Sequence, residues 1–486
     1  MGNFVGIDLG TTFSVLSVYQ DDGKHEIIYD KERFLPSVVY FAEDGSIDVG
    51  NVARQAAQID PDNVVTQIKK KMPQNNTFTL DFNETSYSPE DISCFILKKL
   101  IKDAEKKLGR IDMATITVPA FYNDIAREAT KNAAIKAGIS VPTIISEPVA
   151  AALYYSRTKS MKGKVLIYDL GGGTLDCSVV QIDGDQVEVI GTKGDSFGGT
   201  DFDNKLYDLV NKEYMAKKGS AFSSVENGRT IHQEFMEGRK ISLDENDTPL
   251  VMQGEAGAQP MTILKSDLES AVQEYILKSE IIIETLLDEL NLNKNDIDEV
   301  VLVGGSTRMP LFYDHLKNLM NKENLVTTLN VDEVVSLGAS IYCAIANKDE
   351  QSASQSEDLG DAKLIDVVNH YYGTRVFDIN RNESKNSVII NKNDKYPITL
   401  TKEYFTPSDT TILECVVTQS EINTEDLKFC EIIAETELKN LTGERREGLP
   451  VYITFSIDEN MILVCSYKDE LSGKEVTLEK NLNIKS

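Results

Sequence analysis

The hydrophobic pattern from residue 1 to about residue 346 changes repeatedly between two periods. Short apolar runs, as in buried strands, alternate with stretches in which apolar residues recur every three or four positions, as in helices. The clearest predicted helix has Ser88 as its N-cap, Pro89 at its first position, Asp91 completing a capping box, and Gly109 as its stop. Further helices are expected at residues 123–139 and 266–290. This alternation predicts an α/β domain.

The pattern changes after residue 346. Residues 347–363 are polar with few apolar side chains, which is typical of a linker, and the apolar step Leu364, Ile365, Asp366, Val367 follows. Beyond this step, apolar residues alternate at period two between turn residues, which predicts strands. We therefore expect an α/β domain at 1–346, a linker at 347–367 and an all-β domain at 368–486.

Two stretches of the α/β region repeat one design. In each, an apolar strand ends in an aspartate, a turn of glycine and threonine follows, and an alternating strand leads to an Asp-Gly turn. The same number of residues separates Asp8 from Asp22 and Asp169 from Asp183. A β-hairpin with a polar tip explains either copy alone, but not the matched pair. The repeat predicts two hairpins whose tips face each other across a pseudo-symmetric cleft.

The residue types at the two tips are those that bind an anion. Glycine lets backbone N–H groups approach phosphate oxygens, and the hydroxyls of Thr11, Thr12 and Thr174 add donors, so the paired tips predict a triphosphate site. Carboxylates cannot contact phosphate directly, and they imply a Mg²⁺ ion held through water between them. The carboxylates in question are those of Asp8, Asp169 and Asp176.

A third glycine-rich turn, in the segment EVVLVGGSTRMP, also follows an apolar strand. Gly304 and Gly305 would let a base and a ribose lie against the backbone, and Arg308 could stack on the base. An ordinary turn between a strand and a helix explains the same residues when the segment is taken alone.

The composition limits the possible partners, metal sites and cellular location of the protein. The formal charge of −28 argues against nucleic acid and anionic membranes as partners, because both require a basic surface. The six cysteines are scattered without a C-x-x-C pair, and the four histidines lack ligand spacing, so we expect neither a zinc site nor disulfides. No stretch approaches the roughly 18 apolar residues of a membrane span. We expect a cytoplasmic protein that acts as a monomer.

Four motifs together carry a family resemblance. GIDLGTTFSV, IISEPVAAAL, YDLGGGTLD and VGGSTRMP resemble the signatures of the 70-kilodalton heat-shock protein (DnaK-type) chaperones, and the resemblance extends from residue 4 to about residue 480. It implies an actin/hexokinase-like, two-lobed ATPase domain over 1–346. It also implies that the C-terminal all-β domain is a peptide-binding sandwich.

The resemblance assigns residues to the chemistry. Lys69 falls where the family has the lysine that positions the attacking water, although it could be one of three solvated lysines. Glu147 falls where the family relays between the lobes and the water, although a residue beside a helix N-cap could be structural. Catalytic roles are implied for Lys69, Glu147, Asp169 and Thr174, and phosphate contacts for Gly10, Thr11, Thr12, Gly171, Gly172, Gly173 and Thr174. Asp8 and Asp169 are implied to hold hydrated magnesium.

The resemblance also assigns nucleotide, coupling and peptide contacts. Glu237 and Lys240 match a pair that grips the ribose and base, although an exposed i,i+3 ion pair between them is the alternative. The other expected base and ribose contacts are Gly304, Gly305, Ser306 and Arg308. The expected coupling residues are Pro119, Arg127, Leu364, Ile365 and Asp366. The expected peptide contacts are Phe377, Phe405 and Pro407.

The chain departs from the family pattern at several places. Thr143 and Ser146 stand where members that bind J-domain cochaperones carry a basic residue and an asparagine, so we predict weak stimulation by generic J-domains. Asp378-Ile379 replaces a flexible glycine pair. Ala362-Lys363 replaces an apolar pair before the linker step. The sequence ends at Ser486, directly after the predicted sandwich, so we expect a short, divergent member without the family's helical lid.

These observations favour a DnaK-like molecular chaperone, in which hydrolysis of Mg-ATP controls binding and release of extended apolar polypeptide segments. Its expected partners are unfolded polypeptides, a J-domain cochaperone and a nucleotide-exchange factor. One alternative is a regulatory protein that binds nucleotide with little turnover. The other is a sugar-kinase-like phosphotransferase, which shares the ATPase fold but needs a sugar pocket and has no use for a β-sandwich.

Overall fold

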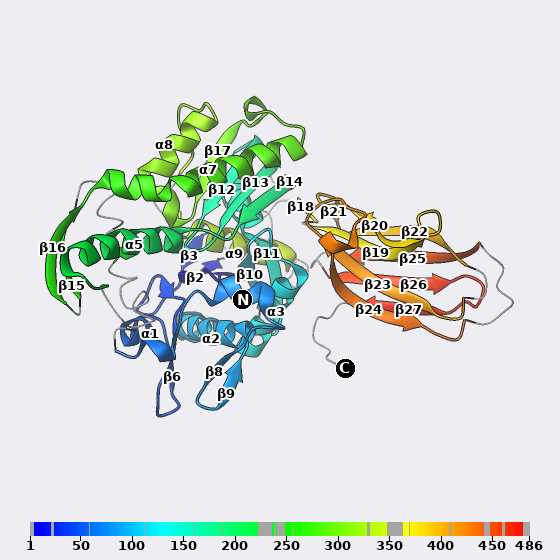
Figure 1. Cartoon of the computed structure of the whole chain (residues 1–486), viewed down its shortest axis with the longest axis horizontal. Coiled ribbons are helices and arrows are strands. Elements are labelled where there is room, and N and C mark those ends of the chain that lie inside the picture. Colours follow the sequence, from blue (N-terminus) through cyan, green and yellow to red (C-terminus); the bar gives the residue numbers. More distant parts are fainter. Residues whose placement is uncertain are drawn as a thin grey trace. The chain divides into compact units, whose positions relative to one another are not determined.

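The chain forms two compact units in the computed structural model. One comprises Met1–Phe121 and Ala129–Leu364, and the other comprises Tyr122–Glu128 and Ile365–Ser486. Figure 1 draws the helices and strands along the chain from blue to red. The structure describes residues 4–20, 24–57, 59–111, 113–159, 161–184, 186–221, 236–237, 240, 248–254, 256–327, 331–347, 363–368, 370–407, 410–441, 448–458 and 462–479.

The first sheet of the first unit has the strand order β11-β10-β1-β2-β3. β1 and β2 form an antiparallel hairpin, and β10 lies parallel to β1 on its other side. The strands are β1 (Phe4–Asp8), β2 (Phe13–Tyr19), β3 (His25–Ile27), β10 (Met113–Val118) and β11 (Val141–Ser146), with β4 (Leu35–Pro36) paired to β2.

A second sheet repeats this arrangement. β12 and β13 form an antiparallel hairpin, β17 lies parallel to β12 on its other side, and β14 pairs with β13. The strands are β12 (Gly163–Leu170), β13 (Leu175–Asp183), β14 (Gln186–Asp195) and β17 (Glu299–Val303). The predicted repeat is therefore confirmed as two hairpins, each flanked by a parallel strand. The Asp22-Gly23 turn lies outside the described residues.

Two helices pack between these sheets with unusually close backbones. α9 (Val334–Ala346) contacts β1, β2, β3 and β10, while α4 (Glu147–Lys159) contacts β12, β13 and β14 and packs on α9. A Cβ atom at Gly6 in β1 would lie 2.2 Å from the backbone nitrogen of Ser340 in α9. The Ser336 hydroxyl of α9 donates to the Gly6 carbonyl at 3.1 Å. Small residues thus set the spacing between the first sheet with α9 and the second sheet with α4.

The three helices predicted from the sequence are confirmed as α2, α3 and α7. The Ser88 hydroxyl accepts the N–H of Asp91, the Asp91 carboxylate accepts the N–H of Ser88, and the helix ends before Gly109, whose φ is 73°. The helices that complete the set around the sheets are α1 (Asn51–Ala56), α2 (Pro89–Leu108), α3 (Asp124–Ala137), α5 (Gly199–Lys218), α7 (Lys265–Glu289) and α8 (Pro310–Leu319).

Short hairpins and 3-10 turns connect these elements. The short strands are β5 (Val39–Phe41), β6 (Ile47–Val49), β7 (Val64–Val65), β8 (Leu80–Phe82), β9 (Thr85–Tyr87), β15 (Thr248–Gly254) and β16 (Gly257–Ile263). The 3-10 turns of this unit are η1 (Pro61–Asn63), η2 (Ile68–Gln74), η3 (Lys294–Asp296) and η4 (Gly305–Arg308).

The second unit contains two four-stranded antiparallel sheets, drawn in yellow to red in Figure 1. Their strand orders are β20-β19-β23-β24 and β22-β25-β26-β27. β18 (Lys363–Val367) begins in the first unit and enters the second at Ile365. The other strands of the second unit are β19 (Tyr371–Asp378), β20 (Glu383–Ile390), β21 (Lys395–Tyr396), β22 (Ile398–Thr406), β23 (Leu413–Ser420), β24 (Glu431–Leu438), β25 (Leu449–Ile457), β26 (Leu463–Asp469) and β27 (Glu475–Glu479), with the 3-10 turn η7 (Leu427–Phe429).

The two sheets of the second unit enclose one hydrophobic core. Val417 of one sheet and Phe455 of the other are both buried in it. The Thr374 hydroxyl lies 3.1 Å from the Tyr467 hydroxyl of the facing sheet. The all-β prediction for this region is confirmed. Within the described part of the chain, no helix is long and apolar enough to cross a membrane.

Replacing Gly338 by alanine tests the close packing of α9. Helix propensity alone predicts that alanine stabilises a helix by roughly 1 kcal/mol relative to glycine. A Cβ atom at Gly338 would, however, lie 1.8 Å from the carbonyl oxygen of Ala150 in α4, and backbone on both sides resists movement. We expect Gly338→Ala to destabilise the first unit by about 3 kcal/mol in denaturant unfolding. Stabilisation would contradict this packing.

Candidate functional site

A cavity of about 750 Å³ lies in the first unit, where the turns of the two repeated hairpins meet. Sixteen of the residues selected from the sequence line it: Asp8, Gly10, Thr11, Thr12, Lys69, Glu147, Asp169, Gly171, Gly172, Thr174, Glu237, Lys240, Gly304, Gly305, Ser306 and Arg308. The sequence motifs that lie far apart in the chain thus converge on one cleft.

The two hairpin tips contact each other at Gly172 and Thr12. A Cβ atom at Gly172 would lie 1.9 Å from the Thr12 Oγ1 atom, so only glycine permits this approach. The Gly171 N–H donates to the Thr174 carbonyl at 3.0 Å and closes the second tip. The Thr12 Oγ1 atom is buried without a hydrogen-bond partner among the described residues. A buried hydroxyl of this kind is suited to bind a polar ligand in the cleft.

Buried carboxylates lie below the tips. Burial raises the pKa of Asp8 to about 7, although Lys69 lowers it in part, and Thr117 donates to Asp8 Oδ1 at 3.2 Å. Burial, followed by repulsion from Glu147 and Asp176, raises the pKa of Asp169 well above its usual range. Both shifts arise first from burial, and repulsion from neighbouring carboxylates adds to it.

Asp176 is not among the residues that line the cleft. It is 1% exposed, and its Oδ1 atom accepts the N–H of Ala120 at 3.1 Å, directly after Pro119. Gly173 does not line the cleft either, since it is covered by Thr11 and Lys70. Among the described residues, no three histidine, cysteine, aspartate or glutamate side chains are grouped to bind a metal ion directly.

The three consecutive lysines have different surroundings. The Lys69 Nζ atom lies 2.6 Å from Glu147 Oε1, and both side chains are only 8% exposed. Burial by itself lowers the pKa of Lys69, but attraction to Glu147 and Asp8 outweighs it and raises the pKa, so the ammonium stays charged. Lys70 reaches Asp201 and Lys71 lies over the Phe78 ring. The solvated alternative is therefore wrong for Lys69.

Glu237 and Lys240 each have a partner elsewhere in the unit. Glu237 Oε2 lies 2.8 Å from the guanidinium of Arg54. Lys240 Nζ lies 2.8 Å from Asp203 Oδ1 and donates to the Gly199 carbonyl at 3.1 Å. Burial raises the pKa of Asp203 to about 6, even though Lys240 lowers it in part. Glu237 and Lys240 both line the cleft.

The third glycine turn is anchored to the second hairpin tip. Gly304 has a φ of 82°, and a Cβ atom there would lie 2.5 Å from the Leu170 carbonyl oxygen. The Ser306 hydroxyl donates to the Gly171 carbonyl at 2.9 Å. Arg308 Nη1 lies 2.5 Å from Asp332 Oδ2, and half of the Arg308 side chain is exposed at the rim.

Sequence reasoning missed several charged residues of this cleft. Arg54, Asp203 and Asp332 pair with residues that it did select, and Arg33 pairs with Glu333 at 2.6 Å. Their partners lie far away in the chain, and the residues occur in no recognisable motif. Only charge complementarity between distant segments could have suggested them.

The expected coupling residues are divided between the two units. Pro119 directly follows β10, while Arg127 in α3 is buried and its Nε atom donates to the Tyr122 carbonyl at 3.3 Å. Leu364, Ile365 and Asp366 belong to β18, where Asp366 is paired with Tyr396 of β21. Residues 348–362 of the expected linker lie outside the described residues.

The structure does not bring the expected peptide contacts Phe377 and Phe405 together. Phe377 lies in β19 three residues after Thr374, which bonds to the facing sheet, so Phe377 points outward. Phe405 follows Tyr404, whose hydroxyl lies 2.9 Å from the Ser387 hydroxyl of the other sheet, so Phe405 also points outward. The two rings are 55% and 61% exposed, and Pro407 follows β22 on the surface.

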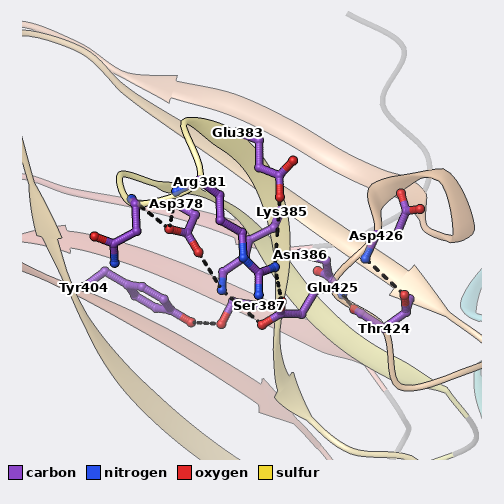
Figure 2. A network of polar contacts seen from close by, with 11 residues as sticks. Asp378, Arg381, Glu383, Lys385, Asn386, Ser387, Tyr404, Thr424, Glu425 and Asp426 are labelled. Atoms are coloured by element: carbon purple, nitrogen blue, oxygen red, sulfur yellow. Dashed lines mark hydrogen bonds and ion pairs between the residues drawn. The ribbon is translucent and has the colours of Figure 1, made fainter.

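A charged network fixes the turn between β19 and β20, as Figure 2 shows. The Asp378 carboxylate accepts the backbone N–H of Arg381 at 3.2 Å. Lys385 lies 3.1 Å from Asp378 and 3.0 Å from Glu425, so it joins this turn to the loop before β24. Arg381 also pairs with Glu425 at 3.1 Å. Asp378 therefore caps the turn.

Fold and cleft together define an α/β protein with two related hairpins around a polar cleft, followed by a β sandwich. The Hsp70 protein family matches residues 4–81 and 73–485. The chaperone protein DnaK of Thermotoga neapolitana is 37% identical over 98% of this chain and 79% of that protein. The chaperone protein DnaK of Thermosipho melanesiensis is 36% identical over the same shares of the two chains. The chain belongs to the Hsp70 family, whose fold is a mixed α/β nucleotide-binding region followed by antiparallel β sheets.

Gly172→Ala tests the contact between the hairpin tips. The new methyl group would overlap the Thr12 hydroxyl, and overpacking of this kind costs about 2 kcal/mol. We expect a lower melting temperature of the first unit in calorimetry, partly restored by Thr12→Ala in the double variant. Gly171→Ala is the matched control, because a Cβ atom there lies 3.8 Å from the nearest atom, the Thr174 carbonyl oxygen. Equal effects of the two alanines would contradict the contact.

Proposed function

We propose that this protein is an ATP-dependent chaperone, in which hydrolysis of Mg-ATP in the cleft controls binding and release of extended apolar polypeptide segments by the β sandwich. The observation that carries the proposal is the buried Lys69–Glu147 ion pair lining the same cleft as the two glycine tips. A charged donor beside two anion-binding turns is suited to phosphoryl chemistry. Membership of the Hsp70 family supports the same assignment.

The hairpin tips hold the phosphates in this proposal. Backbone N–H groups of Gly10 and Gly172 would approach the phosphate oxygens, while the Gly171 N–H keeps the second tip closed through Thr174. The Thr12 hydroxyl, which has no hydrogen-bond partner among the described residues, would donate to one of these oxygens. Thr11 and Thr174 add hydroxyls beside them. A cavity of about 750 Å³ falls within the range of small-ligand sites.

Magnesium fits the carboxylates beside this phosphate site. Burial raises the pKa values of Asp8 and Asp169, and a cation bound there would offset the cost of keeping these buried carboxylates charged. Asp8 and Asp169 would hold the ion through its own water molecules. When bound, Mg²⁺ would neutralise phosphate charge that builds up during transfer. Asp176 would act indirectly, because its carboxylate accepts the Ala120 N–H and does not line the cleft.

Lys69 orients the water that attacks the terminal phosphate in this proposal. Its ammonium is charged and buried, and Glu147 fixes its direction at 2.6 Å. Because water is largely excluded, the donor stabilises charge in the transition state more strongly than it would in solvent. Asp169 and Thr174 complete the catalytic group.

The opposite side of the cleft takes the nucleoside. Glu237 and Lys240, held by Arg54 and Asp203, are proposed to contact the ribose and base. The backbone of Gly304, Gly305 and Ser306 would support the base, with Arg308 stacked upon it at the rim. All of these selected residues line the cavity.

The β sandwich is the proposed peptide-binding part, coupled to the ATPase through Leu364, Ile365 and Asp366 with Pro119 and Arg127. Exposed Phe377 on one sheet would offer one apolar contact. Exposed Phe405 and Pro407, at the end of β22 in the other sheet, would offer a second. Extended clients would gain main-chain hydrogen bonds as well as these contacts.

Cochaperone contacts are proposed to differ from those of better-known relatives. Ser146 and Thr143 have neutral side chains, so neither can form an ion pair with a J-domain. Ser146 is also 1% exposed, and the Thr143 hydroxyl already bonds to Thr115 at 2.6 Å. A dedicated J-domain protein and a nucleotide-exchange factor remain the proposed partners. The six cysteines are free, which suits the reducing cytoplasm where we place the protein.

Lys69→Ala tests the proposed reaction. Loss of a group that acts in the transition state costs on the order of 3 kcal/mol, or about a hundredfold in rate. We expect single-turnover hydrolysis of bound ATP to slow by that factor, while ATP affinity changes by only a few fold. Lys71→Ala, in the same segment, is the matched control and keeps the wild-type rate. Hydrolysis by Lys69→Ala at the wild-type rate would refute the role of this lysine.

A further inference from the structure

We propose that Lys70 is a positioning residue that ties the segment carrying Lys69 to the Gly171–Gly173 turn and so holds Lys69 in register with the proposed phosphate site. This inference rests on the proposed function and adds a residue to which that function assigns no role. The contacts of Lys70 distinguish it from the lysines on either side of it.

Lys70 joins two elements that belong to different hydrophobic cores. It lies in η2, whose Ile68 packs in the core of the first sheet, and reaches α5, whose Phe202 packs in the core of the second sheet. Its Nζ atom lies 3.1 Å from Asp201 Oδ2 and 3.3 Å from Thr200 Oγ1. The Lys70 and Asp201 side chains are 20% and 25% exposed, so the ion pair is partly shielded from water.

A hydrogen bond between Thr200 and Gln67 reinforces the contacts of Lys70 with α5. The Thr200 hydroxyl donates to Gln67 Oε1 at 3.3 Å, and Gln67 directly precedes η2. Thr200 is therefore contacted from both Gln67 and Lys70. This pair of contacts fixes the direction of η2 as well as its distance from α5.

The start of α5 is itself bonded to the second hairpin tip. The Gly199 N–H donates to the Gly171 carbonyl at 3.0 Å, and the Thr200 N–H donates to the Gly172 carbonyl at 2.8 Å. Asp201 Oδ2 also accepts the Gly198 N–H at 2.9 Å, which holds this first turn in place. A continuous path of hydrogen bonds thus leads from Lys70 to the proposed phosphate site.

The stem of Lys70 contacts the same turn. A Cβ atom at Gly173 would lie 2.6 Å from Lys70 Cε, so the missing side chain of Gly173 leaves room for the lysine. From the same 3-10 turn, Lys69 extends to Glu147 and Lys70 extends to Asp201. Two adjacent lysines therefore hold η2 to separate elements. Loss of the Lys70 contact with Asp201 removes one of the two restraints on the segment that carries Lys69.

The experiment compares full-length Lys70→Ala, Lys70→Arg and Lys71→Ala. In the nucleotide-free protein, hydrogen–deuterium exchange is measured over residues 68–74 and 198–202. We expect Lys70→Ala to speed exchange in both segments at least threefold, while Lys70→Arg, which can still pair with Asp201, and Lys71→Ala stay within a factor of about 1.5. Unchanged exchange in Lys70→Ala would overturn the tie, whether or not nucleotide binds.

A second readout uses a fluorescent ADP with Mg²⁺ and single-turnover ATP hydrolysis. We expect Lys70→Ala to release the ADP about tenfold faster and to hydrolyse bound ATP about tenfold more slowly, with arginine restoring both rates to within about threefold. Behaviour of Lys70→Ala that matches Lys71→Ala would overturn the positioning role. If wild-type protein binds no ADP, the proposed function fails, and the exchange measurement still decides whether Lys70 joins the two segments.

Discussion

The approach of Gly172 to Thr12 is the constraint on which the cleft depends. Without a side chain on Gly172, the second tip reaches the Thr12 hydroxyl, and any Cβ atom would hold the two turns apart. Gly6 and Gly338 play the same part deeper in the unit, where α9 packs backbone to backbone on β1 and α4. Since the Gly6 and Gly338 contacts are with backbone atoms, which cannot move aside as a side chain can, they fix the spacing of the elements that carry the cleft.

The polar groups then make this narrow space chemically unusual. Asp8, Asp169 and Glu147 are buried close together, and Lys69 balances only part of their charge. Such an arrangement is costly for folding alone, because buried charges stabilise a protein only when they are well paired. It becomes reasonable if the remaining charge is balanced by a ligand. Cleft geometry and electrostatics are both compatible with the proposed occupant, a polyphosphate with its cation.

Local sequence patterns made much of the fold and of the cleft predictable. The hairpin repeat, the α2 capping box and the glycine turns are each encoded within a few neighbouring residues, and the structure confirms them. The pairing of Arg54 with Glu237 was not predictable, because nothing local to either residue specifies a partner 183 positions away. Which face Phe377 occupies was equally hidden, since a bulge between Tyr372 and Gly373 interrupts the register of β19 with β20.

Isothermal titration of ADP into the wild-type protein tests most directly whether the cleft is a magnesium–nucleotide site, as proposed. Titrations would be run with Mg²⁺ and again after its removal with a chelator. We predict one ADP bound per chain, at least tenfold more tightly with Mg²⁺, because the cation would attract both the phosphates and the carboxylates of Asp8 and Asp169, and this attraction is lost on its removal. No binding, or equal affinity with and without Mg²⁺, would contradict the account.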